Sequence, residues 1–518
     1  MALDGRIKSA HGDGGDGVSM CDGVSMNRLP QLIIVIALLL GVTPLLFLLA
    51  QGGGTVQFDS TIFSVLAFTL KQATLSTLLS IIPSIFVARA LARQNFAGRQ
   101  LLLDLFALPM AVPAIVAVLG VTALIGNAGV LPGLISPYGL TGIIIVHVFF
   151  NLPMATRLFY QSLQTAPQEG YKLASQLGFS ELATFRFVEW PLIKAVLPQV
   201  AAVIFLLCVA SFVVVLTLGG ASATTLEVAL FQSLRMDFDP PRALALSLLQ
   251  VGLCTALIGF AQAAFTQDQG FNSLRNSIDH YSKPTRTVAV VDAITILVSA
   301  LIVVPVLVVI LWRGLENFHL TTLTWRALAT SIGLGFASAT LTMAVGWTLA
   351  KATDLLSRLL SLSGLIMPPA VLATGWFLLL HRLGDSLILT ALFIIALNSL
   401  MALPYVVAAL RGSQRRLAPL QILQTQLGIS GWAALRVIEW PLLRGAATQA
   451  FLVALVLSLG DLTAITLLGS GGIITLPSLL RLEMGHYRGA DAQGTALLLL
   501  ILCGVLTFVG QKLGERNA

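Results

Sequence analysis

Charged residues are scarce in this sequence. Only 10% of its 518 residues are Asp, Glu, Lys or Arg, whereas 57% are hydrophobic. Soluble globular proteins have about a quarter of their residues charged. A chain this long with so few charges cannot cover itself with a water-compatible surface. The composition therefore excludes an ordinary soluble protein and predicts an all-α polytopic membrane protein.

Cysteine is also rare, and the four cysteines show no metal-binding spacing. Cys21, Cys208, Cys254 and Cys503 form no CxxC or Cys/His pattern, so we expect small buried apolar groups and no metal site. The formal net charge of +7 comes from dispersed basic residues without an aromatic platform. We therefore expect the chain to lie in a lipid bilayer and to bind no nucleic acid.

Motifs of nucleotide chemistry and of catalysis are absent from the sequence. It contains no GxxxxGK[ST] phosphate-binding loop and no Gly-Lys pair. It also shows no HExxH motif and no Ser/His/Asp or paired-carboxylate arrangement in a suitable setting. We therefore expect that the chain is not an enzyme, has no catalytic residues and binds no cofactor itself. Any ATP must be used by another polypeptide.

Long apolar runs, in contrast, are abundant. A helix needs roughly 20 apolar residues to cross a bilayer, and this criterion predicts about 12 transmembrane helices. Interior prolines such as Pro113 and Pro368 are tolerated where neighbouring helices satisfy the freed carbonyls. The predicted spans lie near residues 31–50, 66–90, 101–125, 140–162, 196–218, 241–265, 287–312, 326–350, 359–381, 386–410, 447–468 and 492–512.

The distribution of Lys and Arg predicts the orientation. An even number of spans puts both termini on one side, and the basic loops mark that side as cytoplasmic. The basic residues follow the second, fourth, eighth and tenth spans and lie between the halves: Arg93, Arg99, Lys172, Arg186, Lys194, Arg275, Lys283, Arg286, Lys351, Arg358, Arg411, Arg415, Arg416, Arg436 and Arg444.

Two polar stretches divide the chain. Residues 1–28 lack the apolar core of a signal peptide, so we expect a disordered cytoplasmic tail. Met26 is an alternative start, which the N-terminal mass of the purified protein would test. Residues 267–286 form a polar cytoplasmic linker. They separate a first transmembrane half, 29–266, from a second, 287–518.

The two halves share a charged segment 250 positions apart. "QLGFSELATFRFVEWPL" (176–192) and "QLGISGWAALRVIEWPL" (426–442) are identical at ten of seventeen positions without a gap. In the first copy, Gly178 suits the end of a helix and Ser180 the N-cap of the next. We expect that short helix to end at Trp190, before Pro191 begins the next span. The second copy repeats these positions at Gly428, Ser430, Trp440 and Pro441.

The composition of this segment favours a docking partner. Glu189, near the end of its short helix, is disfavoured there by the helix dipole by about 0.3–1 kcal/mol, and the expected pairing with Arg186 returns only about 0.2–0.5 kcal/mol. Large apolar groups such as Phe185 add anchors typical of interfaces. The alternative is an amphipathic loop on the lipid headgroups. The second copy carries Leu435, Arg436 and Glu439 at the corresponding positions.

These residues resemble the cytoplasmic coupling loop in permeases of ABC importers. The spacing of glycine, aliphatic residue, bulky residue and proline is met by Gly178, Val188, Trp190 and Pro191, and again by Gly428, Ile438, Trp440 and Pro441. The usual opening Glu-Ala-Ala is replaced by Lys-Leu-Ala at 172–174 and Ile-Leu-Gln at 422–424. The segments 136–159, 218–234, 237–246 and 460–469 make the whole chain after residue 28 similar to the fused permeases of bacterial thiamine and thiamine pyrophosphate importers.

The resemblance implies two tandem six-helix halves of the type I ABC importer fold in a bacterial inner membrane. It implies a permease that moves thiamine and its phosphate esters inward. The implied partners are a periplasmic thiamine-binding protein and two copies of an ATPase subunit, which use ATP and Mg²⁺. A fused ferric-iron permease is the nearest alternative, and an ion-coupled secondary transporter with repeated halves is another.

The substrate pathway is less clearly marked. Asp461 begins a half-span and corresponds to Ser211 in the first copy. An acid inside the membrane is a functional candidate, and the ring of Trp376 would offer a cation–π contact to a thiazolium. The alternative for Asp461 is a structural hydrogen bond within a helix interface.

Overall fold

The structure is a computed structural model of the whole chain. It describes residues 59–264, 285–351, 355–414, 431–486 and 488–515, apart from 134, 221–222, 385 and 470–471, together with 43–44, 46–47, 49–50, 417 and 426. In this part of the chain the regular structure is helical throughout, which confirms the all-α prediction. The predicted tail at 1–28 and most of the linker at 267–286 lie outside the described residues.

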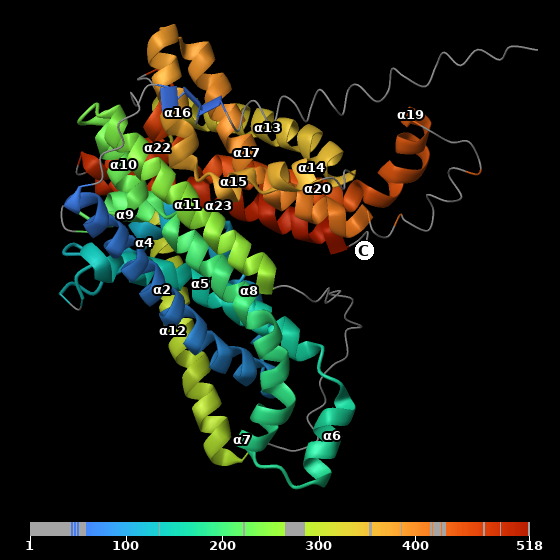
Figure 1. Cartoon of the computed structure of the whole chain (residues 1–518). Coiled ribbons are helices and arrows are strands. Elements are labelled where there is room, and N and C mark those ends of the chain that lie inside the picture. Colours follow the sequence, from blue (N-terminus) through green and yellow to red (C-terminus); the bar gives the residue numbers. More distant parts are fainter. Residues whose placement is uncertain are drawn as a thin grey trace, which may run out of the picture.

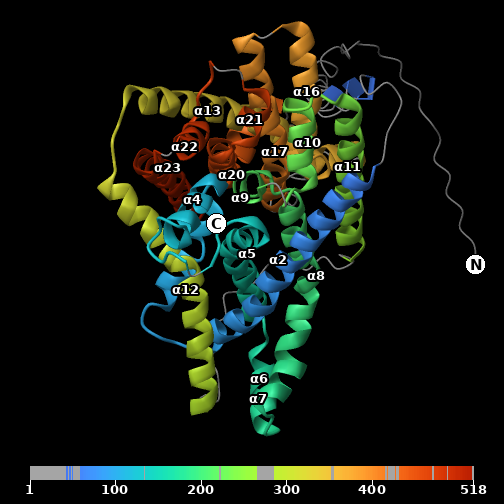
Figure 2. The same ribbon diagram turned by 90° about the vertical axis from the view of Figure 1, so that its left-hand side faces the viewer.

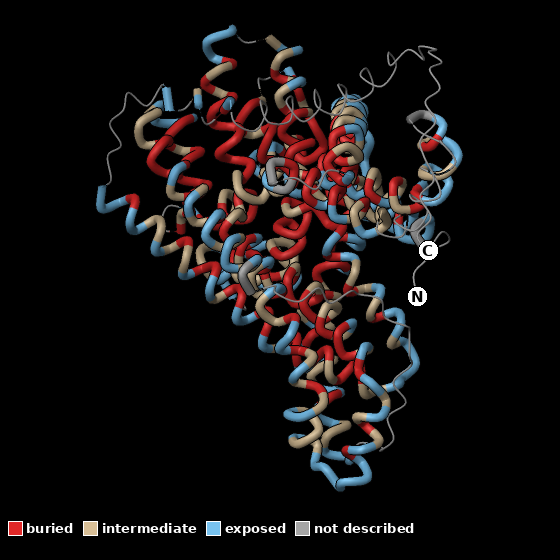
Figure 3. The backbone as a smooth tube through the Cα atoms, turned by 45° about the vertical axis from the view of Figure 1, so that its right-hand side comes forward, coloured by how far each residue is buried: buried red, intermediate tan, exposed pale blue. Residues whose placement is uncertain are grey.

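The helices form two diverging arms (Figure 1). The lower arm contains α2 (Ser60–Arg93), α5 (Gly139–Gln164), α8 (Trp190–Val209) and α12 (Arg286–Glu316). The other arm contains α13 (Thr322–Lys351), α17 (Leu387–Gln414), α20 (Trp440–Gly460) and α23 (Gly489–Glu515). A continuous apolar core spans both arms, and exposed residues gather towards the tip of the lower arm (Figure 3). α11 (Pro240–Ala264) packs on α8.

Shorter helices fill the region where the arms meet. They include α9 (Phe212–Leu218), α10 (Leu226–Arg235), α16 (Pro369–Leu383), α21 (Thr463–Leu468) and α22 (Leu476–Gly485). α10 from the first half packs directly against α16 from the second, as Figure 2 also shows. α12 belongs to the second half in sequence but packs on α2 and on α4 (Ala114–Ile125), so it links the halves.

Four of the predicted spans are not continuous helices, and two of them break before a proline. Residues 101–125 form α3 (Arg99–Leu105), the 3₁₀ turn Leu108–Ala111 and α4, with a bend of 114°. Val112, before Pro113, is extended, as the clash of a proline ring with the preceding residue requires. Residues 359–381 break in the same way at Met367, giving α14 (Leu355–Ser361), α15 (Ser363–Ile366) and α16.

The predicted count of twelve spans is not confirmed in the described part of the chain. Nine helices in the described part are long and apolar enough to cross a membrane, or ten if the bent pair is one span. The predicted span at 31–50 lies mostly outside the described residues. The predicted spans at 196–218 and 447–468 are each interrupted, because α8 ends before Ser211 and α20 ends before Asp461.

The helices α2 and α13 occupy equivalent places in the two halves. The tenth residue of each caps a short helix: the Thr69 hydroxyl accepts the Leu226 N–H at 3.0 Å, and the Ser331 hydroxyl accepts the Leu476 N–H at 2.8 Å. Leu226 and Leu476 begin α10 and α22, whose first N–H groups have no partner within the helix. The sequence repeat thus extends to hydrogen bonds between elements.

Candidate functional site: the two repeated loops

The first loop begins at a helix end of defined geometry. α6 (Gln168–Gln176) is followed by Gly178 with φ of 65°. The Gly178 N–H donates to the Ser175 carbonyl at 3.2 Å, and the Phe179 N–H donates to the Ala174 carbonyl at 2.9 Å. These are the two bonds of a Schellman motif. The prediction that Gly178 ends a helix in the left-handed conformation is confirmed.

Ser180 starts the next helix as predicted. Its hydroxyl oxygen accepts the Ala183 N–H at 3.3 Å, which satisfies one donor at the N-terminus of α7 (Glu181–Thr184). Only Phe179 separates this cap from Gly178, so the chain turns sharply between two rigid ends. The orientation of α7 is therefore fixed by local sequence.

The prediction that the short helix ends at Trp190 is wrong. α7 continues into a π-helical turn, η2 (Phe185–Glu189), and then into α8. Trp190 has φ of −60° and ψ of −39°, and its N–H donates to the carbonyl of Phe185, five residues back. Pro191 has no N–H to donate, and the wider π turn absorbs this loss without a break. Residues 181–209 thus form one continuous helix.

The buried carboxylate of Glu189 pairs with α2. Glu189 is 2% exposed, and its Oε2 accepts a hydrogen bond from Nε of Arg89. Arg89 also donates from Nη2 to the Glu181 carbonyl at 2.8 Å. The expected pairing of Glu189 with Arg186 is wrong, because Glu189 points to the inside of the arm while Arg186 lies over the Phe187 ring.

A second arginine extends this network to the other half of the chain. Arg93 Nη1 lies 2.6 Å from Glu181 Oε2, and its Nη2 lies 2.8 Å from Asp292 Oδ1. Gln94 Nε2 donates to the other oxygen of Asp292 at 2.9 Å. Asp292 is buried on α12. The first loop, α2 and α12 are therefore joined by paired charges and hydrogen bonds.

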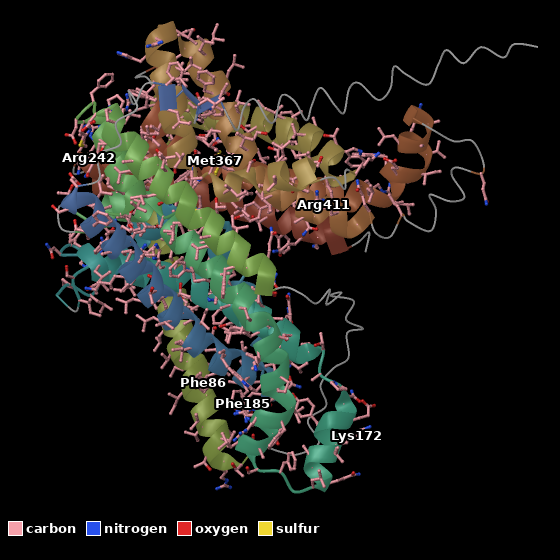
Figure 4. The ribbon with its side chains drawn as sticks, in the orientation of Figure 1. Phe86, Lys172, Phe185, Arg242, Met367 and Arg411 are labelled. Atoms are coloured by element: carbon pink, nitrogen blue, oxygen red, sulfur yellow. The ribbon has the colours of Figure 1, made fainter. Side chains whose placement is uncertain are left out.

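The apolar side chains of the first loop divide into two sets. Phe185 and Trp190 pack on each other, with ring centroids 5.9 Å apart, and Arg89 lies 4.8 Å from the Phe185 ring. Leu182 and Phe187, in contrast, are 74% and 63% exposed. Figure 4 labels Phe185 inside the lower arm. The outward anchors are thus Leu182 and Phe187, and sequence analysis missed Phe187.

The second loop repeats the same helical geometry where it is described. α19 (Gly431–Ala434) leads into a π turn, η4 (Leu435–Glu439), and α20 begins at Trp440, before Pro441. Gly428 and Ser430 lie outside the described residues. Glu439 Oε2 lies 2.6 Å from Lys351 Nζ. The Arg436 and Trp440 side chains are exposed, and Trp440 lies 6.5 Å from the Trp347 ring.

Lys351 is the counterpart of Arg89, since each is the thirtieth residue of its helix, α13 and α2 respectively. Each donates to the glutamate that ends a π turn. Both halves therefore share the same pairing. A basic residue near the end of α2 or α13 pairs with the Glu of the Glu-Trp-Pro sequence. A basic residue roughly 90–100 positions before each Glu-Trp-Pro was visible in the sequence.

The three residues predicted for the substrate pathway lie apart from the loops. Ser211 and Asp461 occupy the equivalent helix interruptions. The Ser211 hydroxyl lies 2.9 Å from His147 Nε2. Asp461 accepts the backbone N–H groups of Thr463 and Ala464 at 3.0 and 2.9 Å. Trp376 is 1% exposed, with its ring stacked on that of Phe393 in the core.

An open cavity of about 520 Å³ lies at the end of α13 away from its loop, between α13, α21 and α22. Its lining is mainly apolar, with Arg481 and His486 as basic members. Arg481 donates to the Thr466 hydroxyl at 3.3 Å. None of Ser211, Asp461 and Trp376 lines it, although Leu462, next to Asp461, does.

Comparisons with known proteins identify a transport permease, and the similarity to individual relatives covers nearly the whole chain. A family model described as "Binding-protein-dependent transport system inner membrane component" matches residues 80–267. The thiamine transport system permease proteins ThiP of Brucella abortus (strain 2308) and of Escherichia coli (strain K12) are each 40% identical to this chain, over 491 and 488 residues; each alignment covers 89% of this chain and 90% of the relative. That of Salmonella typhimurium is 39% identical over 497 residues, covering 90% and 91%. The chain therefore belongs to the family of thiamine transport system permease proteins.

Proposed function

We propose that this chain is the membrane-spanning permease of an ABC importer that moves thiamine and its phosphate esters from the periplasm to the cytoplasm. The permease role and thiamine as cargo are supported by the family and by the names of its members, and transport of the phosphate esters is part of the proposal. These names do not favour the ferric-iron alternative. The chain would be a multi-pass protein of the bacterial inner membrane, with both termini and both loops in the cytoplasm.

In this proposal two copies of an ATP-binding subunit dock on the loops 178–191 and 428–441. The supporting observation is the continuous helix from Glu181 to Val209, which joins an exposed tip to a membrane span without a hinge. Exposed Leu182 and Phe187 on the first loop, with Val437 and Trp440 on the second, offer apolar anchors to such a partner. A periplasmic thiamine-binding protein would deliver the substrate on the other side.

The mechanism uses the rigidity of these helices. ATP binding would close the two ATPase subunits and bring the loops together, so that the diverging arms approach each other and the pathway opens outward. Hydrolysis of ATP, which requires Mg²⁺ in the partner, would let the arms separate again. The permease itself would supply no chemistry, only transmission between two packed states.

Uptake in vesicles tests the cargo and the energy source. Proteoliposomes with the permease and its ATPase, supplied with ATP and the binding protein, should accumulate radiolabelled thiamine. Omission of ATP or of the binding protein should abolish accumulation, and an ionophore should not. Uptake driven by an ion gradient without ATP would show that the chain is a secondary transporter instead.

Gly178 and Gly428 test the docking assignment. A β-branched residue at a φ of 65° is strained by about 1–2 kcal/mol, although no atom lies within 4 Å of the point that a Cβ would occupy at Gly178. The double variant Gly178→Val/Gly428→Val should insert normally but lose ATPase stimulation by the loaded binding protein. Gly133→Val is the matched control, since Gly133 also has a positive φ and open space but lies outside both loops. Full stimulation in the double variant would contradict docking at these loops.

A further inference from the structure

Glu227 is a buried acid without a protein partner. It is the second residue of α10, it is 1% exposed, and neither carboxylate oxygen has a hydrogen-bond partner among the described residues. Burial of an unpaired carboxylate is strongly unfavourable, and acids inside membrane proteins are therefore candidates for functional sites. No role in the loops or in the helix repeat accounts for Glu227.

A second, partly buried acid, Asp461, comes from the other half of the chain. Asp461 is close enough for its charge to act on Glu227, and α16 packs on both α10 and α21, the helix that Asp461 caps. Neither acid follows the repeat: 250 positions away, Glu227 meets Pro477 and Asp461 meets Ser211. Each half thus contributes one acid that its counterpart lacks, and the helices α10 and α16 that meet between the halves lie side by side (Figure 2).

Gln250 adds an unused amide beside these acids. It is 1% exposed on α11, and neither Oε1 nor Nε2 has a partner among the described residues. Cys254 lies four residues after Gln250 and is close enough to Glu227 to feel its charge. Residues four apart share one face of a helix, so Gln250 and Cys254 lie on the same face of α11. Since α10 packs on α11, Gln250 is a buried amide on the helix next to Glu227, with no partner among the described residues.

We propose that Glu227, Asp461 and Gln250 form the site that holds the cationic ring system of the substrate on its way through the membrane. This inference rests on the proposed function. Thiamine carries one permanent positive charge on its thiazolium ring, which a carboxylate of this pair would offset. Its aminopyrimidine ring has hydrogen-bond donors and acceptors that match the amide of Gln250. Since the three residues come from both halves, a movement of α16 away from α10 would open the site.

The test uses the complete importer in proteoliposomes at saturating binding protein. Glu227→Gln keeps the shape and removes the charge, so we expect thiamine uptake to fall at least tenfold while the complex keeps hydrolysing ATP and the thermal unfolding midpoint does not decrease. Asp461→Asn should reduce uptake similarly, because it also removes a negative charge. The start of α21 should be kept, because Asn can still accept the backbone N–H groups that Asp461 accepts. Glu483→Gln is the matched control, since Glu483 is a buried acid on α22, and its uptake should stay within twofold of wild type.

Equilibrium binding provides a second measurement. The permease–ATPase complex in nanodiscs, without binding protein, should bind radiolabelled thiamine at least tenfold more weakly after Glu227→Gln. An uncharged analogue with thiophene in place of thiazolium should compete poorly with thiamine on the wild type. If Glu227→Gln does not assemble, Asp461→Asn decides the question.

The possible failures can be distinguished. Wild-type vesicles that take up no thiamine with ATP and binding protein would overturn the proposed function. Wild-type vesicles that do take it up, together with unchanged uptake in Glu227→Gln and Asp461→Asn, would overturn only the site. Equal losses in Glu227→Gln and Glu483→Gln would also overturn it, because any buried acid would then matter alike.

Discussion

The two repeated loops have the same backbone geometry but different anchors. In the first, the side chains of Arg89 and Glu189 are 15% and 3% exposed, and in the second those of Lys351 and Glu439 are 46% and 16% exposed. The π turn before each Trp-Pro follows from local sequence, which both copies share. The depth of the ion pair depends on residues far away in the chain, which the copies do not share.

The first loop also reaches the opposite half of the protein. Arg93 joins Glu181 to Asp292 on α12, whereas Lys351 on α13 pairs with Glu439 within the second half of the chain. A displacement at the first loop is therefore transmitted to α12 directly. The repeat has thus produced two loops with the same shape and unequal attachment.

Arg89→Ala and Lys351→Ala should differ most in their loss of stability. Removal of Arg89 leaves Glu189 buried without its partner, which costs about 3–5 kcal/mol, whereas the more exposed Lys351 pair contributes about 0–1 kcal/mol. Thermal unfolding of the purified variants should show a large decrease for Arg89→Ala and a small one for Lys351→Ala. Equal decreases would mean that the two anchors are equivalent.

The link from Arg93 to Asp292 should have the next largest effect. A hydrogen bond to a charged group contributes about 1.5–3 kcal/mol, so Arg93→Ala and Asp292→Ala should each destabilise the protein. The double variant should lose less than the sum, because residues in contact are not additive. Transport and ATPase activity measured together should show weaker coupling in both single variants. Strict additivity would contradict the link between the halves.

The helix cap at Ser180 should have a smaller, local effect. Ser180→Ala removes the acceptor for the Ala183 N–H and should cost about 1 kcal/mol. Hydrogen exchange of the amides in 181–184 should then become roughly fivefold faster, which is the factor that this energy represents. Ser430→Ala is the matching change in the second loop. If Ser430 caps its helix as Ser180 does, hydrogen exchange of the amides in 431–434 should accelerate by the same factor.

The caps on α10 and α22 should show no difference between the halves. Thr69→Val and Ser331→Ala each remove one acceptor from a buried backbone N–H, and each should cost about 1 kcal/mol. Thermal unfolding midpoints should decrease by similar amounts. A much larger decrease for one variant would show that the long helices are not equivalent at this depth.

Sequence analysis succeeded where the signal was local. The left-handed Gly178 and the Ser180 cap follow from residue types at fixed spacing, and the all-helical membrane fold follows from composition. It failed at Trp190, because the rule that a residue before proline avoids helical angles does not consider a π turn. It also failed to interrupt the spans at Val112 and Met367, where the same rule does hold.

Contacts between distant elements were beyond the sequence. Glu189 pairs with Arg89, one hundred residues earlier, and no local pattern distinguishes this partner from Arg186. Glu227 was missed although a single acid in the apolar segment "LEVALF" (226–231) was visible. Its significance depends on Asp461 and Gln250, which only the packing of α10 against α11 and α16 brings near.

The continuous helix from Glu181 to Val209 also restricts how relatives of this chain can vary. Its 29 residues measure about 43 Å at a rise of 1.5 Å per residue. One inserted residue would turn everything beyond it by about 100° and swing Glu189 or the spanning face away from its neighbours. Insertions and deletions among relatives should therefore occur in the turns before α6 or after α8, and the helix from Glu181 to Val209 should keep a constant length.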